Sequence, residues 1–590
     1  MKPLKFRAFR RIRQIFLFVL TFSAHALAAP DAGSLLEQQR QSERRPVAPT
    51  TLPHIVPESS KPATAARSQQ RIKVKSFKLT GSITAFSVDE LLALVHDLVG
   101  KELNLTELQA AAARIATHYR EHGYFLANAY LPKQDITDGD ITIAIQEGIL
   151  DPAADGVRIQ PAQGMKESNL RLDDTLAQNI VKDAVVPGEP LRQEALEHAI
   201  LLLNDIPGIS ASANLEPGTT PGSTRIVLDM NEGPLLTTNV GVDNTGSRTT
   251  GMNRLSANAN LSDINGMGDQ IALSSNLSEI ADNYYARLAY TLPMGINGLK
   301  FGLAYSHLAY TVGLELANSQ ARGSADTVTF SANYPLLRTR QASLRLNANL
   351  DHKNLYDEAL GNAINRKRID VVNLGLAWEN FDTWIGGGLN QATLTVTAGQ
   401  LDLGGVSSAL NADQADKGPH ANGNFSKTGY SFTRMQHGSE KLSFMISLNG
   451  QFPAKNLDSS EKIQFGGPYG VRAYPIGEAS GDEGHKFSLE GRYLLFGNTV
   501  VGDVQSIAFV DIARVVLNHD ASHLLMTLPN TYNIAGWGLG VVFGKPGKQD
   551  FRITFAQKIG DNPARNPTTG KDSDGSNDSS RFWLTANFYF

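Results

Sequence analysis

Residues 342–350 read Ala-Ser-Leu-Arg-Leu-Asn-Ala-Asn-Leu, a stretch in which apolar and polar residues alternate strictly. Successive side chains of a β-strand point to opposite faces, so this pattern predicts a strand with one oily and one wet face. The same alternation recurs in residues 255–261. A soluble sandwich would also alternate, but Asn, Arg, Lys and Ser recurring on the polar face favour a water-filled lumen inside a membrane barrel.

Working outward from this stretch, we place sixteen antiparallel strands of roughly 8 to 10 residues in residues 235–590, the length that a tilted outer-membrane strand needs. The expected starts lie near residues 236, 254, 269, 284, 299, 327, 342, 369, 391, 427, 441, 486, 503, 537, 551 and 582. Connections after even-numbered strands average about 7 residues and those after odd-numbered strands about 20, an asymmetry typical of periplasmic turns and surface loops. The sequence therefore predicts a membrane β-barrel.

The composition limits the classes of function. The chain has 590 residues and no Cys, which excludes a disulfide framework, a Cys-ligated zinc site and a thiol nucleophile. Six of its 54 Lys and Arg lie in residues 1–28, which leaves 48 against 58 Asp and Glu in the remainder. An acidic mature chain argues against nucleic acid as a partner.

The N-terminus has the pattern of an export signal. Basic residues from Lys2 to Arg13 precede an apolar stretch that ends in Ala26-Leu27-Ala28, so residues 1–28 are predicted to be a signal peptide. A membrane anchor is the alternative, but the apolar segment is shorter than the ~20 residues that a spanning helix requires. No later stretch reaches that length, so a mature chain that enters a membrane must do so as a barrel.

A tethered helix is predicted to follow the signal. Residues 29–45 contain a short polar helix, and residues 46–70 form a linker whose prolines from Pro46 to Pro62 exclude a packed helix or a central strand. A helix on such a linker can bind at a distant site in the protein or dissociate from it, as a plug does. A disordered tail is the alternative.

Two small α+β modules are predicted in residues 71–150 and 151–234. Each follows the order strand, helix, helix, strand, strand, and the two end alike, in Glu147-Gly148 and Glu232-Gly233. In the first module the last two strands are expected at residues 124–131 and 141–145. Tandem modules with an exposed sheet edge suit the capture of an extended peptide by strand addition. Rigid spacers are the alternative.

The longest predicted connection, an inward-folded loop within residues 450–485, contains Val471-Arg472-Ala473-Tyr474. Here the chain resembles the two-partner secretion transporters of the haemolysin secretion/activation type, within the outer-membrane assembly superfamily. The sixth loop of those proteins folds into the barrel and has a Val-Arg-Gly-Tyr tip. Ala473 replaces the usual Gly, so the tip has less backbone freedom than the family pattern. The resemblance covers nearly the whole chain, because the family shares the signal, the plug helix with its linker, two modules called POTRA and the sixteen-stranded barrel.

The resemblance implies a contact between the loop and the barrel wall. Relatives pair the loop Arg with an inward Asp in a Phe-x-Asp-x-Gly strand, which matches residues 509–513 here with Ala in place of Gly. An Arg472–Asp511 pair in a hydrated lumen would contribute about 1 kcal/mol, enough to fix the register but little for stability. Ile507 and Phe509 would then face inward, which we interpret as a packing surface for the loop. A register error in this strand is the alternative.

The function implied by the resemblance is export of one dedicated, large, β-rich exoprotein from the periplasm to the cell surface, with or without activation of that cargo. The POTRA modules would bind the exoprotein in the periplasm, using the second helix and second strand of each module, and the helix in residues 29–45 would occupy the pore at rest. In the first module the expected binding residues are Leu108, Ile115, Tyr119, Tyr124 and Phe125.

The resemblance also implies two further partners, outer-membrane lipid and the barrel-assembly machinery. Phe590 resembles the C-terminal signal that this machinery recognises. A monomer is expected, without cofactor, metal or nucleic acid. A barrel-assembly insertase shares the loop motif, but such proteins generally have three or more modules and no plug helix. A passive porin would have no use for the modules.

One stretch fits an enzyme motif. His118-Tyr119-Arg120-Glu121-His122 matches the inverted zinc-protease pattern. It ends a helix at Gly123, and a zinc site would still need a further ligand and a substrate cleft. There is no Gly-x-Ser-x-Gly elbow and no phosphate-binding Gly-Lys-Ser/Thr loop. We therefore expect no enzymatic activity.

Overall fold

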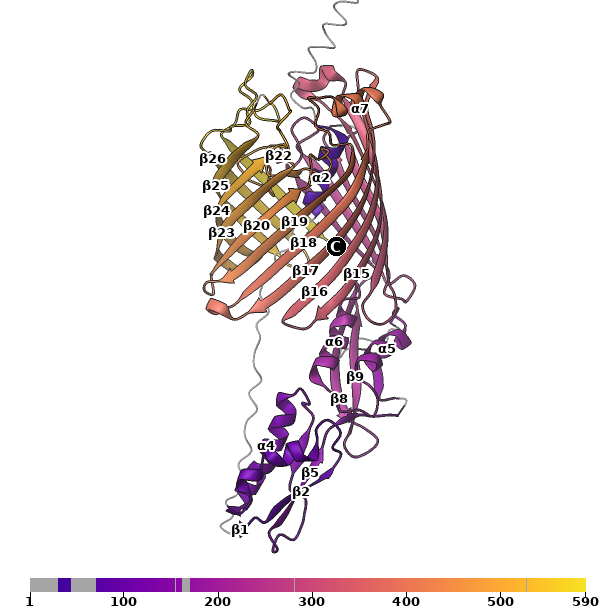
Figure 1. The fold of residues 1–590 in the computed structure, drawn as a ribbon, viewed down its shortest axis with the longest axis vertical. Coiled ribbons are helices and arrows are strands. Elements are labelled where there is room, and N and C mark those ends of the chain that lie inside the picture. Colours follow the sequence, from indigo (N-terminus) through magenta and orange to yellow (C-terminus); the bar gives the residue numbers. More distant parts are fainter. Residues whose placement is uncertain (1–29, 44–70, 154, 162–169, 281, 527) are drawn as a thin grey trace, which may run out of the picture.

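The computed structural model describes residues 30–43, 71–153, 155–161, 170–280, 282–526 and 528–590. A closed antiparallel barrel of sixteen strands forms the C-terminal part, and two α+β modules lie below one rim (Figure 1). Helix α2 (Ala32–Glu43) lies inside the barrel. The predicted signal peptide and the linker 46–70 lie outside the described residues. In the described part of the chain, no helix is long and apolar enough to cross a membrane.

The first module has a three-stranded sheet in the order β2-β5-β4. Its elements are β1 (Arg71–Lys73), β2 (Ser76–Gly81), α3 (Val88–Ala93), η1 (His96–Leu98), β3 (Glu102–Asn104), α4 (Leu105–Glu121), β4 (Asn128–Tyr130) and β5 (Asp140–Gln146). The predicted elements occur in the predicted order, but the first strand is split into β1 and β2, and the short strand β3, which was not predicted, lies between the two helices and pairs with β1. The strand predicted at residues 124–131 shortens to β4, because Phe125 and Leu126 leave the sheet and pack against the core of the second module.

The second module repeats this plan around β9. Its elements are β6 (Ile149–Leu150), β7 (Val157–Pro161), α5 (Asp174–Ala184), α6 (Gln193–Asn204), β8 (Ile209–Pro217) and β9 (Ser223–Glu232). Strand β9 is parallel to β6 and β7 and antiparallel to β8. Apolar residues of α5, α6 and the sheet form one buried core, which includes Val181, Leu203 and Leu228.

The barrel strands alternate up and down in chain order, and β10 closes the barrel on β27. They are β10 (Leu236–Asp243), β11 (Arg254–Ser262), β12 (Gln270–Ser278), β13 (Tyr284–Pro293), β14 (Lys300–Thr311), β15 (Arg322–Arg338), β16 (Ala342–Ala359), β17 (Asn362–Asp382), β18 (Gly388–Asp402), β19 (Gly423–His437), β20 (Leu442–Pro453), β23 (Glu483–Thr499), β24 (Gly502–Val516), β25 (Thr531–Lys545), β26 (Gln549–Ile559) and β27 (Ser580–Tyr589). Every strand overlaps its predicted position.

The two ends of the barrel differ as predicted. Connections at the end near the modules are tight, as in residues 339–341 and 500–501, although η3 (Trp384–Gly386) occupies one of them. The opposite end carries the long loops, which include η2 (Leu314–Ser319) and α7 (Ser407–Gln414). Strand length was underestimated: β17 has 21 residues. Because about 9–11 residues suffice to span a membrane, the longer strands extend past the hydrocarbon layer.

The outer face of the barrel is apolar and the inner face polar. Leu288, Leu303 and Leu374 are more than half exposed on the outside. In β16, Leu350 is exposed while Asp351 and Lys353 of the neighbouring inward positions are buried in the lumen. An apolar belt of this extent requires lipid around it.

Candidate functional site

The longest connection of the barrel, residues 454–482 between β20 and β23, folds back into the lumen. It contains the short strand pair β21 (Ile463–Gln464) and β22 (Ser480–Gly481). Its buried apolar side chains pack against β24, β25 and β26. This cluster comprises Phe465, Val471, Ala473, Tyr474 and Ala479 of the loop and Ile507, Phe509, Ala513, Val515, Tyr532, Ile534 and Ala556 of the wall. The inward orientation of Ile507 and Phe509 is thus confirmed, and they form the predicted packing surface for the loop.

Arg472 at the loop tip is bound by the barrel wall. Its guanidinium donates to both carboxylate oxygens of Asp511, with Nε–Oδ2 at 2.8 Å and Nη2–Oδ1 at 2.9 Å. The contact that the resemblance implied is therefore present, and it is bidentate. The backbone N–H of Arg472 also donates to Asp511, at 3.1 Å. The guanidinium lies flat on Phe509, with Cζ 3.3 Å from the ring centroid, a stacking that arginine favours.

The environment of this contact is dry, contrary to the expected hydrated lumen. Arg472 is 6% exposed, and Asp511 and Glu490 are 0% exposed. Glu490 accepts hydrogen bonds from Arg472 and Arg492, and its carboxylate lies 3.5 Å from Arg552. The expectation of about 1 kcal/mol for a solvated pair is therefore wrong here, because removing one partner of a buried pair costs about 3–5 kcal/mol. Arg472, Asp511 and Glu490 are called the Arg472 cluster below.

Three residues of this site were missed by sequence reasoning. Glu490 and Ser488 of β23 stand directly opposite Phe509 and Asp511 of β24, and the Ser488 hydroxyl donates to Asp511. The indole N–H of Trp583 donates to the carbonyl oxygen of Arg472 at 2.8 Å. The sequence of β23 contains a signal for this site. Glu490 lies between Ser488 and Arg492 on the inward face of the strand, while the outward positions are apolar.

Ala473 occupies its position without backbone strain. It is not among the non-glycine residues of the described chain with positive φ, so the expected restriction of the tip has no effect on this turn. Its methyl group instead packs over Gly536 of β25. A Cβ added at Gly536 would lie 2.5 Å from the Cβ of Ala473. The space between the loop tip and the wall therefore holds only one methyl group at this point, either that of Ala473 or one at position 536.

Helix α2 packs on the wall formed by β14 to β17. Its buried residues Ala32, Leu35 and Leu36 belong to one apolar cluster with Tyr310, Leu355 and Ile369 of the wall. Polar contacts hold the same helix along its length. The backbone N–H of Ala32 donates to Asp357 at 2.8 Å, Arg40 reaches Asp351 at 3.3 Å, and Asp31 lies 3.3 Å from Lys367.

The helix also contacts the first half of the loop 454–482. Gln464 donates to the carbonyl oxygen of Ser34 at 3.1 Å, and the Ser459 hydroxyl donates to Asp31. A Cβ added at Gly33 would lie 2.7 Å from the hydroxyl oxygen of Ser459, so only glycine allows this close approach. These contacts place the helix inside the pore, as predicted.

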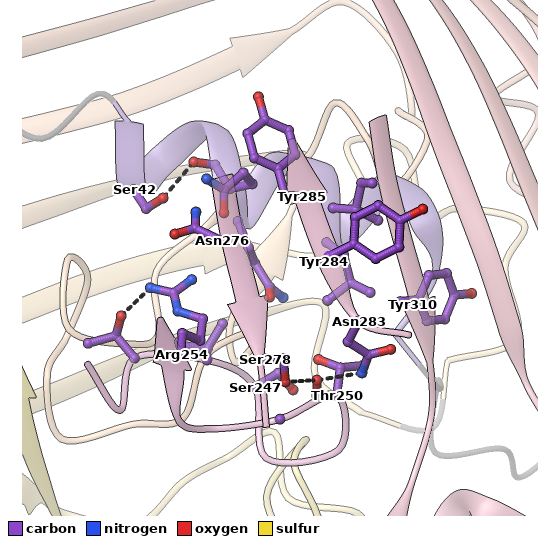
Figure 2. A pocket seen from close by; sticks show the side chains of 18 of the residues that line it. Ser42, Ser247, Thr250, Arg254, Asn276, Ser278, Asn283, Tyr284, Tyr285 and Tyr310 are labelled. Atoms are coloured by element: carbon purple, nitrogen blue, oxygen red, sulfur yellow. Dashed lines mark hydrogen bonds between the residues drawn. The ribbon is translucent and has the colours of Figure 1, made fainter. Parts of the chain in front are cut away.

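A narrow polar cleft remains beside α2 (Figure 2). The helix contributes Ser42, and the barrel wall contributes Arg254, Asn276 and Tyr285. The cleft has a volume of about 100 Å³. One water needs about 10–15 Å³ of such space, so the cleft holds about seven to ten waters. Helix α2 thus occupies space in the lumen next to this cleft.

A closed barrel with an internal helix and an Arg-pinned loop matches one family of known proteins. The model of the haemolysin secretion/activation proteins of the ShlB/FhaC/HecB type matches residues 222–543, more than half of the chain. The chain belongs to this haemolysin secretion/activation family. The model of the ShlB-type POTRA domain matches residues 72–148, the first module. As a member of the family, the protein is an outer-membrane secretion transporter with its POTRA modules in the periplasm, as predicted.

Individual relatives of this haemolysin secretion/activation protein align over most of its length. It is 27% identical to the heme/hemopexin transporter protein HuxB of Haemophilus influenzae (strain 86-028NP), over 92% of this chain and 94% of HuxB. It is 24% identical to the outer membrane transporter CdiB of Escherichia coli, over 84% of this chain and 82% of CdiB. The solved structure of CdiB from Escherichia coli has a TM-score of 0.71 at 19% identity and covers 96% of this chain and 100% of that one. The fold is therefore shared with CdiB.

Most residues expected to bind the exoprotein in the first POTRA module of this family member are core residues. Leu108, Ile115 and Tyr119 are at most 1% exposed, and Phe125 packs against the second module. The prediction is wrong for Leu108, Ile115 and Tyr119, because the apolar period of α4 marks the face that covers the sheet. Phe125 is only partly buried, so its role stays a prediction. Tyr124 is half-buried, and the guanidinium carbon of Arg192 lies 6.0 Å from its ring centroid.

Glu147, at the end of the first module, is a buried hydrogen-bond acceptor. It accepts from the backbone N–H groups of Thr84 and Ala85 and from the hydroxyl of Tyr119, the last at 2.8 Å. Burial and this carboxylate raise the pKa of the Tyr119 phenol, which therefore stays a donor. We expect Glu147→Ala to destabilise the module by about 3 kcal/mol, because four donors, including the Thr84 hydroxyl, lose their acceptor. Faster proteolysis of residues 71–150 in the purified transporter would show this, with the exposed Glu121→Ala as control.

The histidines of the zinc-protease-like stretch pack around Phe86. The ring centroids of His118 and His122 lie 4.7 and 5.2 Å from that of Phe86. The His118 Nε2 lies 3.4 Å from Glu90. Among the residues that the structure describes, no three His, Asp or Glu side chains form a group that could hold a metal ion. Members of the family are transporters, which fits the expectation that the chain is not an enzyme.

Proposed function

We propose that this transporter exports one dedicated, large, β-rich exoprotein through its barrel, and that α2 is the plug that leaves the pore when the exoprotein binds. The observation that carries the proposal is the position of α2 inside a closed barrel. Its apolar attachment is of moderate strength, because Leu35 and Leu36 contribute about 1.5–3 kcal/mol each at most and the smaller Ala32 contributes less. Release of the helix therefore costs far less than opening the barrel.

The second module supplies a surface for the exoprotein. Strand β8 pairs with β9 on one side, and no described strand pairs with its other edge. An extended segment added to this edge would gain main-chain hydrogen bonds without requiring one sequence. On the far side of the membrane, folding of the exoprotein buries apolar groups and makes return unfavourable, which gives the transport its direction.

Deletion of residues 71–233 tests the export function. We expect secretion of the exoprotein encoded beside the transporter to be lost, since the modules that bind it are gone, while the barrel still inserts. Heat-modifiable migration on gels checks insertion, and immunodetection in the medium checks secretion. Undiminished secretion by the inserted barrel would show that the modules are dispensable, as they would be in a passive porin.

The contact between Ala473 and Gly536 gives a second test. Gly536→Ala should lower secretion several-fold, because two Cβ atoms 2.5 Å apart overlap and the loop tip must move. Adding Ala473→Gly to the same chain should restore secretion, since it removes the other methyl group. A double variant no better than Gly536→Ala would mean that the loop position does not limit export.

A further inference from the structure

The second module is fixed on the periplasmic rim of the barrel. Arg338 donates to both carboxylate oxygens of Asp205, each at 2.9 Å. The backbone N–H of Asp173 donates to the carbonyl oxygen of Gly266 in the turn between β11 and β12, at 2.9 Å. A Cβ at Gly268 of the same turn would lie 2.7 Å from Ile206 of the module. Such close contacts give the space between module and barrel a defined shape.

A cavity of about 290 Å³ lies between this module and the barrel. Leu176 and Ile180 of α5 and Leu202 of α6 line it from the module side. Lys300, Asn333 and Arg345 line it from strands β14, β15 and β16. The module side thus offers an apolar surface beside Asp205, and the barrel side offers two cations among the apolar residues Pro293, Ile296 and Pro335.

The barrel side of the cavity belongs to the lumen. Arg345 lies on the same face of β16 as Asp351 and Lys353, since side chains alternate along a strand, and those two residues are buried in the lumen near α2. Lys300 stands directly opposite Asn333 in the register of β14 and β15. A chain that leaves the module through this cavity would therefore meet the inner wall of the barrel first.

The positive charge of the cavity is not neutralised by its own residues. Asp205 is the carboxylate in the lining, and Arg338 binds both of its oxygens. Lys300 donates to the main-chain oxygen of Asp205 at 2.6 Å. In the described part of the chain, Arg345 forms no salt bridge. A carboxylate ligand beside an apolar group would complement this pair of walls.

We propose that this cavity is a transfer site, where an extended segment of the exoprotein passes from the second module into the lumen with an apolar side chain on α5 and α6 and an acidic one on Lys300 and Arg345. The inference rests on the proposed export function. Neighbouring side chains of an extended segment point in opposite directions, so one such pair can contact both walls at once. The volume lies near the lower end of the range for small-ligand pockets, which suits one or two side chains but no folded element.

Site-specific photo-crosslinking tests the position. A photoreactive residue at Asn333 should form an adduct with the exoprotein during secretion, whereas one at Leu303, which is 57% exposed on the outer face of β14, should not. Absence of the adduct at position 333 in a chain that secretes normally would overturn the transfer site and leave the export function intact. Absence of secretion by the wild-type chain would instead overturn the export function.

Charge reversal tests the chemistry. Arg345→Glu should lower secretion at least about tenfold, since it repels an acidic segment, whereas Arg345→Lys should retain most of it. Lys441→Glu, an exposed cation in the turn at 438–441 on the same rim, is the matched control. Wild-type secretion by inserted Arg345→Glu would overturn the proposed acidic partner. If Arg345→Glu fails to insert, the presence or absence of the crosslinked adduct at position 333 still tests whether the exoprotein passes through the cavity.

Discussion

Arg472→Ala is expected to lower secretion of the exoprotein more than about tenfold while the barrel still inserts. Without the guanidinium, Glu490 retains Arg492 and Arg552, but Asp511 retains only the Ser488 hydroxyl and the backbone N–H of residue 472, neither of which carries a charge. Leaving a buried carboxylate without its cation costs about 3–5 kcal/mol. The sixteen paired strands cannot rearrange to relieve this penalty, so the loop 454–482 leaves its place on the wall.

Two variants separate this explanation from a general loss of stability. Arg514→Ala removes an exposed arginine from the same strand and should leave secretion unchanged. Combining Asp511→Ala with Arg472→Ala removes the unpaired carboxylate, so the loop of the double variant should be less susceptible to protease than that of Arg472→Ala alone. The hypothesis would be falsified if Arg472→Ala secreted normally with a protease-sensitive loop.

The positions of the barrel strands could be predicted because a period of two persists where one face meets lipid. The same reasoning explains why their lengths could not. In β17, residues 362–368 read Asn-Ala-Ile-Asn-Arg-Lys-Arg, and the predicted start is Ile369. Apolar residues alternate on the lipid-facing side only from Val372, because Ile369 and Val371 face the lumen. Above the hydrocarbon layer both faces of a strand are wet, so hydrogen bonding continues without any apolar contrast in the sequence.

The site was predictable in its partners but not in its environment. The resemblance implied the Arg472–Asp511 contact, whereas its dryness depends on Phe465 and Tyr474 of the loop covering it, which only the folded loop reveals. In the first POTRA module, by contrast, the sequence prediction chose the wrong residues as binding residues. Leu108 and Ile115 follow the period of an apolar helix face, and that period does not distinguish a core from a binding groove.

Deletion of residues 31–43 is expected to raise single-channel conductance in planar bilayers several-fold. Helix α2 fills space in the lumen, and the cleft beside it has a volume of about 100 Å³, so removing the helix widens the path for ions. A single substitution should act in the same direction. Leu36→Glu places a charge at a position that is 2% exposed in the cluster with Tyr310 and Ile369, which favours release of the helix. Leu314→Glu, at a position 53% exposed in an outer loop, is the control.

Deletion of residues 31–43 also separates the roles of the two segments inside the lumen, helix α2 and the loop 454–482. None of the partners of Arg472 lies on α2, so the loop should keep its Arg472 cluster, and its resistance to protease, when the helix is removed. Conversely, Arg472→Ala leaves the contacts of α2 with Asp357 and Asp351 intact, so its conductance should rise less than that of the deletion. Ser459 and Gln464 do connect helix and loop. If each change alters both conductance and protease sensitivity to the same extent, these two contacts make the plug and the loop a single gate.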